Sequence, residues 1–236
     1  MNKLFKFKPY PDKISPLYVI ITVLFVACLM IANMVSGRLV QVGSLTLTSA
    51  IFLFPITYIF GDILTEVYGF ERSRLVIWLG VIANLVMSLY FFLILKTPVP
   101  VFFDGGDAYA RVLGFTPLVV IASILGYFAG EFANSSTLSI LKKVTKGKHL
   151  WMRTIGSTIA GEFVDTLIFI TIAFAGILPT GALISMLIAQ YIFKTLYEIL
   201  ATPLTYLIVG KVKKIEQLDT FDYGVKYNPF SLKIKQ

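Results

Sequence analysis

Residues 45–67 read LTLTSAIFLFPITYIFGDILTEV, a mostly apolar run in which two carboxylates appear near the end. As an α-helix, this run is long enough to cross about 30 Å of hydrocarbon. An ionised side chain near the centre of a bilayer costs roughly 2.5–3.5 kcal/mol on insertion scales. Asp62 and Glu66 therefore need partners, a polar cavity or protons. This stretch predicts a membrane helix that faces a polar interior.

Five further runs have the same apolar character, so that the chain has six predicted spans: residues 16–36, 45–67, 75–95, 117–141, 155–178 and 183–209. Of the 236 residues, 57% are hydrophobic, more than a soluble domain needs. Helices satisfy their own backbone groups in lipid, and the ten-residue alternation of an outer-membrane barrel is missing. We expect an all-α membrane protein, a six-transmembrane-helix bundle that forms one transporter domain over residues 1–210, followed by a tail over residues 211–236.

The basic residues predict an orientation. Seventeen of the 21 Lys and Arg residues fall on one side of the predicted spans, whereas only Arg38, Lys96 and Arg111 fall on the other. The positive-inside rule places both termini, and with them the C-terminal tail, in the cytoplasm. The tail is expected to rest on the cytoplasmic helix ends, and the external connection 96–116 to be a loop. The first span is too long for a signal-peptide core and is expected to stay as an anchor.

Two carboxylates of the second span are four residues apart. Asp62 and Glu66 therefore share one face of a regular helix. Pro55 and Gly61 precede them, and these residue types favour a broken helix of the kind that lines transporter cavities. For Glu66, contact with interfacial water is an equally good interpretation.

A short pattern occurs twice, as GEFANS at residues 130–135 and as GEFVDT at residues 161–166. The two copies lie in consecutive, oppositely directed spans, which leaves internal pseudo-symmetry open. Glu131 and Asn134 are three residues apart, and so are Glu162 and Asp165, so each pair occupies one helix face. Bonds between helices, worth only about 0.6–2 kcal/mol each, are the structural alternative to a cavity lined by these groups. We favour the cavity.

The sixth span carries a polar stripe, because Gln190, Lys194 and Glu198 recur every four residues. Lys194 is expected to form an internal ion pair and either to neutralise an acid or to touch substrate. Asn33, at the outer end of the first span, either forms part of a gate or marks the interface. Aromatic residues near the acids, such as Tyr58, Phe132 and Tyr197, are candidates for stacking on a planar ligand.

Missing motifs exclude several classes of function. The chain has no Walker A loop, and its single histidine and single cysteine cannot build a metal site or an internal disulfide. Residue 59 is isoleucine where the Gly-x-Gly-Asp pattern of intramembrane aspartyl proteases requires glycine. The net charge of +8 is explained by topology, so no direct nucleic-acid partner is expected. We expect no cofactor, no metal and no catalytic residue, whereas small residues spaced by four are compatible with a homodimer.

Several strings together resemble the queuosine precursor transporters, the YhhQ family of the bacterial inner membrane. They are GDILTEVYG at 61–69, the two glutamate motifs, Lys194 with Tyr197 and Glu198, and Asn228-Pro229-Phe230. The resemblance runs through nearly the whole chain in order, and the nine-residue string is the most specific part of it. It implies six helices and import of the 7-deazaguanine bases from which the tRNA nucleoside queuosine is made, 7-cyano-7-deazaguanine or 7-aminomethyl-7-deazaguanine.

Such a substrate suits the intramembrane acids. A guanine-like base presents two adjacent donors that a carboxylate can accept in a fork. The residues expected to bind substrate are Glu131, Asn134, Glu162, Asp165, Asp62, Lys194, Glu198, Gln190 and Asn33. Proton coupling and facilitated diffusion both stay open. The alternatives are a substrate-capturing subunit for another nucleobase or vitamin that works with a separate ATPase, an intramembrane enzyme, and a structural membrane subunit.

Overall fold

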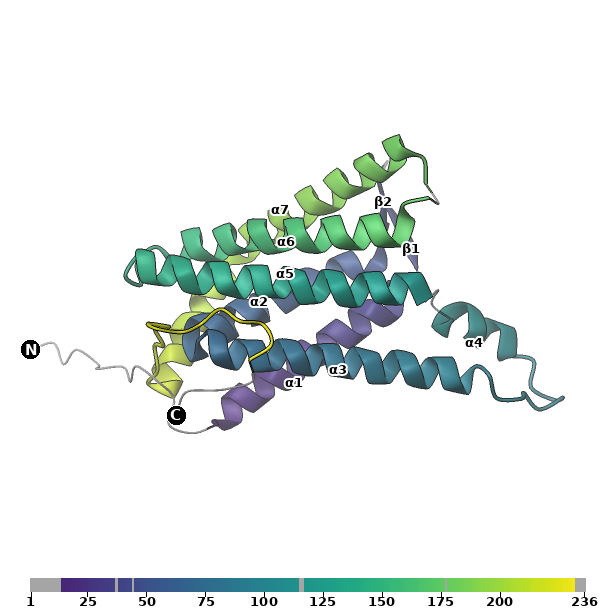
Figure 1. Cartoon of the computed structure of the whole chain (residues 1–236), viewed down its shortest axis with the longest axis horizontal. Coiled ribbons are helices and arrows are strands. Elements are labelled where there is room, and N and C mark those ends of the chain that lie inside the picture. The colour runs from purple at the N-terminus through teal and green to yellow at the C-terminus, as the bar shows by residue number, and fades with distance from the viewer. Residues whose placement is uncertain (1–13, 37, 44, 115–116, 177, 232–236) are drawn as a thin grey trace, which may run out of the picture.

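The computed structural model describes residues 14–36, 38–43, 45–114, 117–176 and 178–231. Its long helices lie side by side along the longest axis of the molecule (Figure 1). The described elements are α1 (Pro16–Val35), β1 (Leu39–Val42), β2 (Leu45–Thr48), η1 (Ser49–Phe52), α2 (Phe54–Ile63), η2 (Leu64–Tyr68), α3 (Phe70–Ile94), α4 (Gly106–Leu113), α5 (Pro117–Val144), α6 (Leu150–Phe174) and α7 (Thr180–Glu216).

Five segments of the described chain are long and apolar enough to cross a membrane: Pro16–Val35, Ser49–Tyr68, Phe70–Ile94, Leu150–Phe174 and Thr180–Glu216. The remaining predicted span corresponds to α5, a helix of 28 residues that packs against α3 and α6. With a rise of 1.5 Å per residue, α5 is about 42 Å long and can also cross a bilayer. The protein is an all-α membrane bundle, as the sequence predicted.

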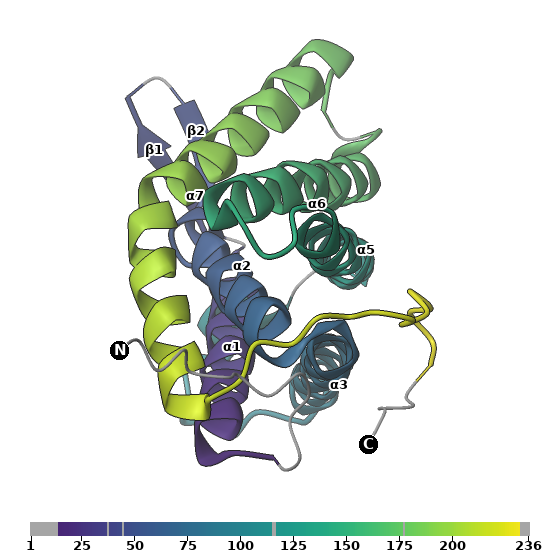
Figure 2. The same cartoon turned by 90° about the vertical axis from the view of Figure 1, so that its left-hand side faces the viewer.

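The second span forms the centre of this bundle. Of its most apolar 18 residues, 78% are buried, compared with 17–44% in the other four candidate spans. In the end-on view, α2 is surrounded by the other long helices, and it packs against α1, α5 and α7 (Figure 2). Contacts of α1 with α3, α3 with α5, α5 with α6 and α6 with α7 connect the surrounding helices. Polar side chains on α2 must therefore find their partners inside the protein.

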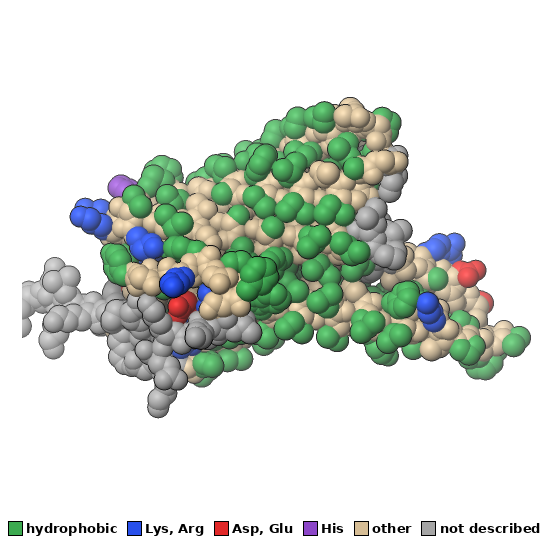
Figure 3. Space-filling view, viewed as in Figure 1, with side chains coloured by type: hydrophobic (Ala, Val, Ile, Leu, Met, Phe, Trp, Pro, Cys, Tyr) green, Lys and Arg blue, Asp and Glu red, His purple; other side chains and the backbone are tan. Residues whose placement is uncertain are grey.

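The outer faces of the bundle are apolar. Large side chains such as Val23 on α1, Val86 on α3 and Leu200 on α7 are exposed. Hydrophobic side chains cover much of the surface along the bundle, whereas most of the charged side chains lie towards its two ends (Figure 3). An exposed apolar surface of this extent marks contact with lipid rather than with water.

The central span is divided into three helical segments. A 3₁₀ turn, η1, is followed at Phe54 by α2, and α2 continues into a π-helical segment, η2. Pro55 lies in the first turn of α2, where its missing N–H removes no helical hydrogen bond. The predicted break thus falls just before Pro55, and a second irregularity, the π-segment, follows Gly61. Single π-turns occur frequently at functional sites.

Several predicted boundaries differ from the structure, and α3, for example, begins at Phe70 rather than at residue 75. Residues 39–48 form the hairpin β1–β2, with Leu39 paired to Thr48, instead of leading directly into the second span. Gly43 adopts a φ of +62°, the left-handed conformation that tight hairpin turns require. The predicted external loop contains α4. In addition, α6 begins at Leu150, before residue 155, and α7 extends beyond residue 209 to Glu216.

The chain after α7 lies across one end of the bundle (yellow in Figures 1 and 2). The Thr220 N–H donates to Val67 O at 3.2 Å, and the Trp78 indole N–H donates to Pro229 O at 2.8 Å. The tail therefore rests on helix ends, as predicted. We call this the basic end, because Lys142 and Arg153 lie there, and call the opposite end the hairpin end.

Candidate functional site

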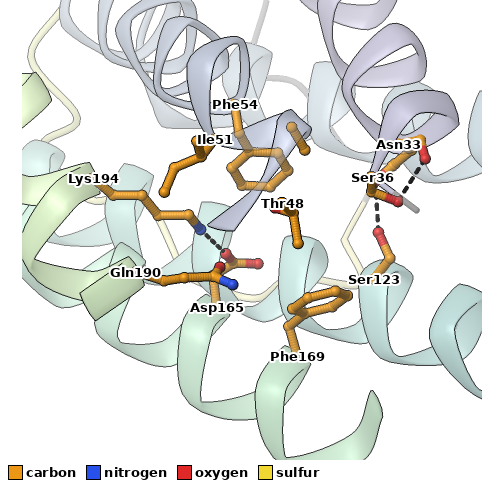
Figure 4. Close-up of a pocket in the computed structure, with 11 residues that line it drawn as sticks. Asn33, Ser36, Thr48, Ile51, Phe54, Ser123, Asp165, Phe169, Gln190 and Lys194 are labelled. Atoms are coloured by element: carbon orange, nitrogen blue, oxygen red, sulfur yellow. Dashed lines mark hydrogen bonds and ion pairs between the residues drawn. The ribbon is translucent and has the colours of Figure 1, made fainter. Parts of the chain in front are cut away.

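A pocket lies towards the hairpin end, between the central span and the surrounding helices (Figure 4). Its lining comes from six helices and one strand and consists of Asn33, Ser36, Thr48, Ala50, Ile51, Phe54, Ser123, Asp165, Phe169, Gln190 and Lys194. Its cavity volume is about 40 Å³. The pocket is thus narrow, with polar and aromatic walls.

One wall of the pocket carries Lys194 and Asp165, which form an ion-paired triad with the neighbouring Glu162. The Lys194 ammonium lies 2.7 Å from Asp165 Oδ2, to which it donates a hydrogen bond, and 2.8 Å from Glu162 Oε2. All three side chains are almost fully buried. Asp165 and Glu162 share one face of α6, and Lys194 reaches them from α7. The predicted internal ion pair of Lys194 is therefore present, with Glu162 and Asp165 as partners rather than Glu198.

Two phenylalanines, Phe54 from α2 and Phe169 from α6, extend into the pocket (Figure 4). The Lys194 ammonium also lies 4.5 Å from the centre of the Phe54 ring, within the range of a cation–π interaction. Next to the triad, Gln190 is buried and its Nε2 has no hydrogen-bond partner among the described residues. The pocket therefore offers ring faces, a carboxylate, an ammonium and an amide donor to one ligand.

The far wall of the pocket is polar but uncharged. Asn33 donates to Asn84 Oδ1 at 2.6 Å and accepts from Ser123 Oγ at 2.7 Å, which links α1 to α3 and α5. Ser36 and Thr48 complete this wall. Asn33 thus lines the pocket, whereas its role in gating stays a prediction.

Further into the protein, towards the basic end, a second group of carboxyls is buried. Asn134 on α5 donates to Asp62 Oδ1 on α2 at 2.9 Å. Both oxygens of Glu131 and both oxygens of Glu198 have no hydrogen-bond partner among the described residues. All these acids are at most 1% exposed. The structure therefore places Asp62, Glu131, Asn134 and Glu198 inside the bundle but not among the residues that line the pocket, and the same holds for Glu162.

Glycines allow the helices that carry these acids to come close together. A Cβ atom on Gly61 would lie 2.9 Å from Glu131 Oε2, so the α2 backbone packs directly on that carboxyl. A Cβ on Gly130 would lie 3.0 Å from Gly161 O, and one on Gly161 would lie 2.9 Å from Gly130 O. The two repeated motifs thus meet face to face between α5 and α6. Their origin by duplication, and pseudo-symmetry of the whole bundle, stay predictions.

Glu66 belongs to a different group from Asp62. Its carboxylate is bound by Arg153 Nη2 and by Lys213 Nζ, each at 2.7 Å, with Lys142 Nζ at 3.5 Å. Asp62, four residues earlier, accepts from Asn134 instead, so the two carboxylates have different partners. In place of the interfacial water expected as one alternative for Glu66, the structure has three cations at the basic end, the buried Lys142 and Arg153 and the partly exposed Lys213.

Asp219 from the tail completes this basic-end cluster. It lies 2.6 Å from Lys142 Nζ and 2.8 Å from Lys213 Nζ. Burial opposes ionisation of this carboxyl, but the two ammonium groups outweigh burial and hold the pKa of Asp219 below its ordinary value. The cluster of Glu66, Lys142, Arg153, Lys213 and Asp219 thus joins the central span to α5, α6, α7 and the tail.

Sequence reasoning missed Phe54, Phe169, Thr48 and Ser123 as pocket residues. With 20 phenylalanines in the chain, composition could not single out two of them. Of the aromatic residues proposed for stacking, Phe132 packs against Phe70 and Phe128 instead. Among the described residues, no group of three or more His, Cys, Asp or Glu side chains could hold a metal ion. The arrangement suits recognition of a small polar, planar molecule.

Comparisons with known proteins agree with a transport function. A "Probable queuosine precursor transporter" of Bacillus subtilis (strain 168) is 26% identical over 176 residues, which is 74% of this chain and 77% of that protein. No solved structure matches the chain. The model of the family described as "Putative vitamin uptake transporter" matches residues 48–208. Because this match covers more than half of the chain, the protein belongs to this family of vitamin uptake transporters.

Proposed function

We propose that the protein imports queuosine precursor bases across the bacterial inner membrane, with both termini in the cytoplasm. The observation that carries this proposal is the pocket at the hairpin end, where the Lys194–Asp165 pair, Gln190 and two phenylalanines surround one space. The named function of the Bacillus relative and the resemblance of the sequence motifs support the same substrate class. Residues 1–210 would form the transporter domain, and residues 211–236 a cytoplasmic tail.

The chemistry of a 7-deazaguanine base matches these groups. Its ring N–H and exocyclic amine form a donor pair that the Asp165 carboxylate can accept in a fork. Its carbonyl oxygen needs a donor, which Lys194 or the unpartnered Gln190 amide can supply. Phe54 and Phe169 provide apolar faces for the flat ring. The pocket would widen when a base enters, because its free space is small.

The charges in the pocket favour the neutral cyano base over the cationic aminomethyl base. Both carboxylates next to the pocket, Glu162 and Asp165, are already paired with Lys194. The remaining polar wall, with Asn33, Thr48 and Ser123, carries no charge. An added ammonium group would therefore lie near the Lys194 ammonium and compete with it for these two carboxylates. We expect 7-cyano-7-deazaguanine to bind more tightly.

The direct test is uptake of labelled precursor bases into bacterial cells that lack their own transporter and their own synthesis of these bases. Uptake should fall by about tenfold or more in Asp165→Asn and Gln190→Leu variants, because each removes a hydrogen bond to the base. The exposed Asp107 on α4 provides a matched carboxyl-to-amide control, Asp107→Asn, which should transport normally. No uptake by the well-expressed wild-type chain would refute the proposed substrate.

The family description is also compatible with a second function. In this alternative, the protein binds another nucleobase or vitamin, and a separate ATPase drives its transport. Purification from mild detergent distinguishes the two: an ATPase that copurifies, and uptake that requires it, would favour this alternative. A homodimer stays a prediction.

A further inference from the structure

Glu131 is a fully buried carboxyl on α5. Its side chain is 0% exposed, and neither of its oxygens has a hydrogen-bond partner among the described residues. The α2 backbone fixes its position, because a Cβ on Gly61 would lie 2.9 Å from Oε2 and 3.4 Å from Oε1. An ionised carboxylate without partners is so unfavourable inside a protein that the group takes up a proton instead.

Among the described residues, the groups that face Glu131 carry no positive charge that would oppose this protonation. Those close enough to interact electrostatically are Tyr58 and Asp62 on α2, Tyr127 on α5 itself, and Glu162 and Asp165 on α6. Lys194, on α7, is occupied by Glu162 and Asp165. A negative charge on Glu131 would therefore add to those of its acidic neighbours, and neighbouring like charges favour the neutral carboxyl.

A second unpartnered group points to the same place. The Tyr58 hydroxyl is buried and has no hydrogen-bond partner among the described residues. It lies against Gly130, whose Cβ would be 2.8 Å from the hydroxyl oxygen, one residue before Glu131. A hydroxyl can accept a hydrogen bond from a protonated carboxyl or donate one to a carboxylate. After a small movement of the two side chains, the Tyr58 hydroxyl can thus form a hydrogen bond with Glu131 in either of its protonation states.

Asp165 connects this carboxyl to the pocket. Asp165 lines the pocket, pairs with Lys194, and also interacts electrostatically with Glu131. A base that shares the Asp165 carboxylate changes the charge distribution that Glu131 faces. Binding of the base and binding of a proton at Glu131 are therefore linked, and such a coupling is reciprocal.

We propose that Glu131 is the proton-binding residue of a symport in which one proton crosses the membrane with each base. A hydronium ion on the external side transfers a proton to the Glu131 carboxylate and becomes water. The new O–H bond breaks when the proton passes to a water molecule on the cytoplasmic side, which becomes hydronium and leaves the carboxylate. No bond to the base is made or broken. This inference rests on the proposed function for its substrate, but the proton site itself can be tested without any base.

The first experiment is infrared spectroscopy of the purified protein in lipid without substrate. The wild-type spectrum minus that of Glu131→Gln should show the carbonyl stretch of a protonated carboxyl at neutral pH, and this band should shift in D₂O. The same difference spectrum for Asp107→Asn should lack such a band, because Asp107 is exposed. Absence of the band from the Glu131→Gln difference at neutral and mildly acidic pH would show that Glu131 is ionised and overturn the proposal.

The second experiment uses liposomes that contain the wild-type protein and a trapped pH dye. External 7-cyano-7-deazaguanine should acidify the lumen, and a one-unit pH gradient, alkaline inside, should drive up to about tenfold accumulation of the base. Glu131→Gln should lose this accumulation but keep exchange of labelled for unlabelled base. Base uptake by the wild type without proton movement would overturn the proposal, and this arm needs no variant to fold.

The two experiments separate the two claims. If the infrared band is present but no deazaguanine base binds or crosses, the proposed substrate fails while the proton site stands. If the base crosses and Glu131→Gln accumulates it as the wild type does, the coupling role of Glu131 fails while the proposed function stands.

Discussion

Individual residues decide how closely α5 and α6 can pack. A side chain at Gly130 of α5 would collide with the α6 backbone, and a side chain at Gly161 of α6 would collide with the α5 backbone. This close approach brings Glu131 and the Glu162–Asp165 pair towards one another. Small residues at four-residue spacing therefore serve the polar interior as well as the packing of membrane helices.

Substitution of Gly161 tests this close approach. In Gly161→Ala the new Cβ would lie 2.7 Å from Asn134 Cβ and 2.9 Å from Gly130 O, so the helices must separate. We expect a loss of about 1–3 kcal/mol in the free energy of unfolding, typical of overpacking. Gly210→Ala in α7 is the control, because nothing lies within 4 Å of its added Cβ. Thermal unfolding in detergent measures both, and equal melting temperatures would contradict the packing argument.

The buried charges of Lys194, Glu162 and Asp165 stabilise the fold only when all three are present. Lys194→Met leaves Glu162 and Asp165 buried next to each other without their cation. Removing one partner of a buried ion pair typically costs about 3–5 kcal/mol. We expect the variant to be strongly destabilised, and Lys194→Met combined with Glu162→Gln and Asp165→Asn to recover much of the loss. Urea unfolding of the three proteins in detergent provides the comparison, and a stable single variant would show that the triad is dispensable.

At the scale of elements, the tail acts as the cap of α3. That helix begins after Gly69, which has a φ of +86° and no side chain to cap the helix. Asp222 from the tail accepts from the Phe70 N–H at 3.0 Å instead, and Ser139 on α5 also donates to it at 2.5 Å. A carboxylate at a helix N-terminus is favoured by the unsatisfied N–H groups there. The tail thus ties α3 and α5 together at the basic end.

The ionic cluster next to this cap predicts a pH dependence of stability. Because Lys142 and Lys213 hold the pKa of Asp219 below its ordinary value of 3.8, its stabilisation is present above pH 3.8. It is lost as the pH falls through the lower pKa of the folded state. Asp219→Asn should reduce stability by about 1 kcal/mol or less at pH 7, and the difference should shrink between pH 5 and pH 3. Melting temperatures across this range measure it, and a difference that grows towards pH 3 would contradict the ion-pair assignment.

The sequence predicted best those elements that a local pattern of residues determines. Long apolar runs fixed the spans within a few residues, since only helices satisfy backbone groups in lipid. The hairpin β1–β2 was missed because its residues read as the start of the second span. The π-segment was also missed, and spacing could not show that Asp62 and Glu66 bind different partners, because the partners come from other helices.

At the scale of the whole molecule, the two ends of the bundle differ. The hairpin end has the pocket, whereas the basic end is covered by the tail and held by the Glu66 cluster. Sequence spacing predicted the buried residues Glu162, Asp165, Gln190 and Lys194, because intramembrane charge is rare and therefore informative. It could not predict Phe54 and Phe169, because phenylalanine also faces lipid throughout the chain.

This asymmetry predicts which side of the membrane reaches the pocket. The test starts from a Cys28→Ala variant, which removes the single cysteine of the chain. In this background, the thiol introduced by Ser36→Cys should react with a membrane-impermeant maleimide on intact cells, because Ser36 lines the open pocket. A thiol in Gln217→Cys, at the end of α7, should react only after the membrane is permeabilised, because Lys and Arg residues gather on the cytoplasmic side. Excess 7-cyano-7-deazaguanine should slow labelling at position 36 but not at position 217. The reverse pattern of labelling would place the pocket on the cytoplasmic side and would be incompatible with capture of the base from outside in this conformation.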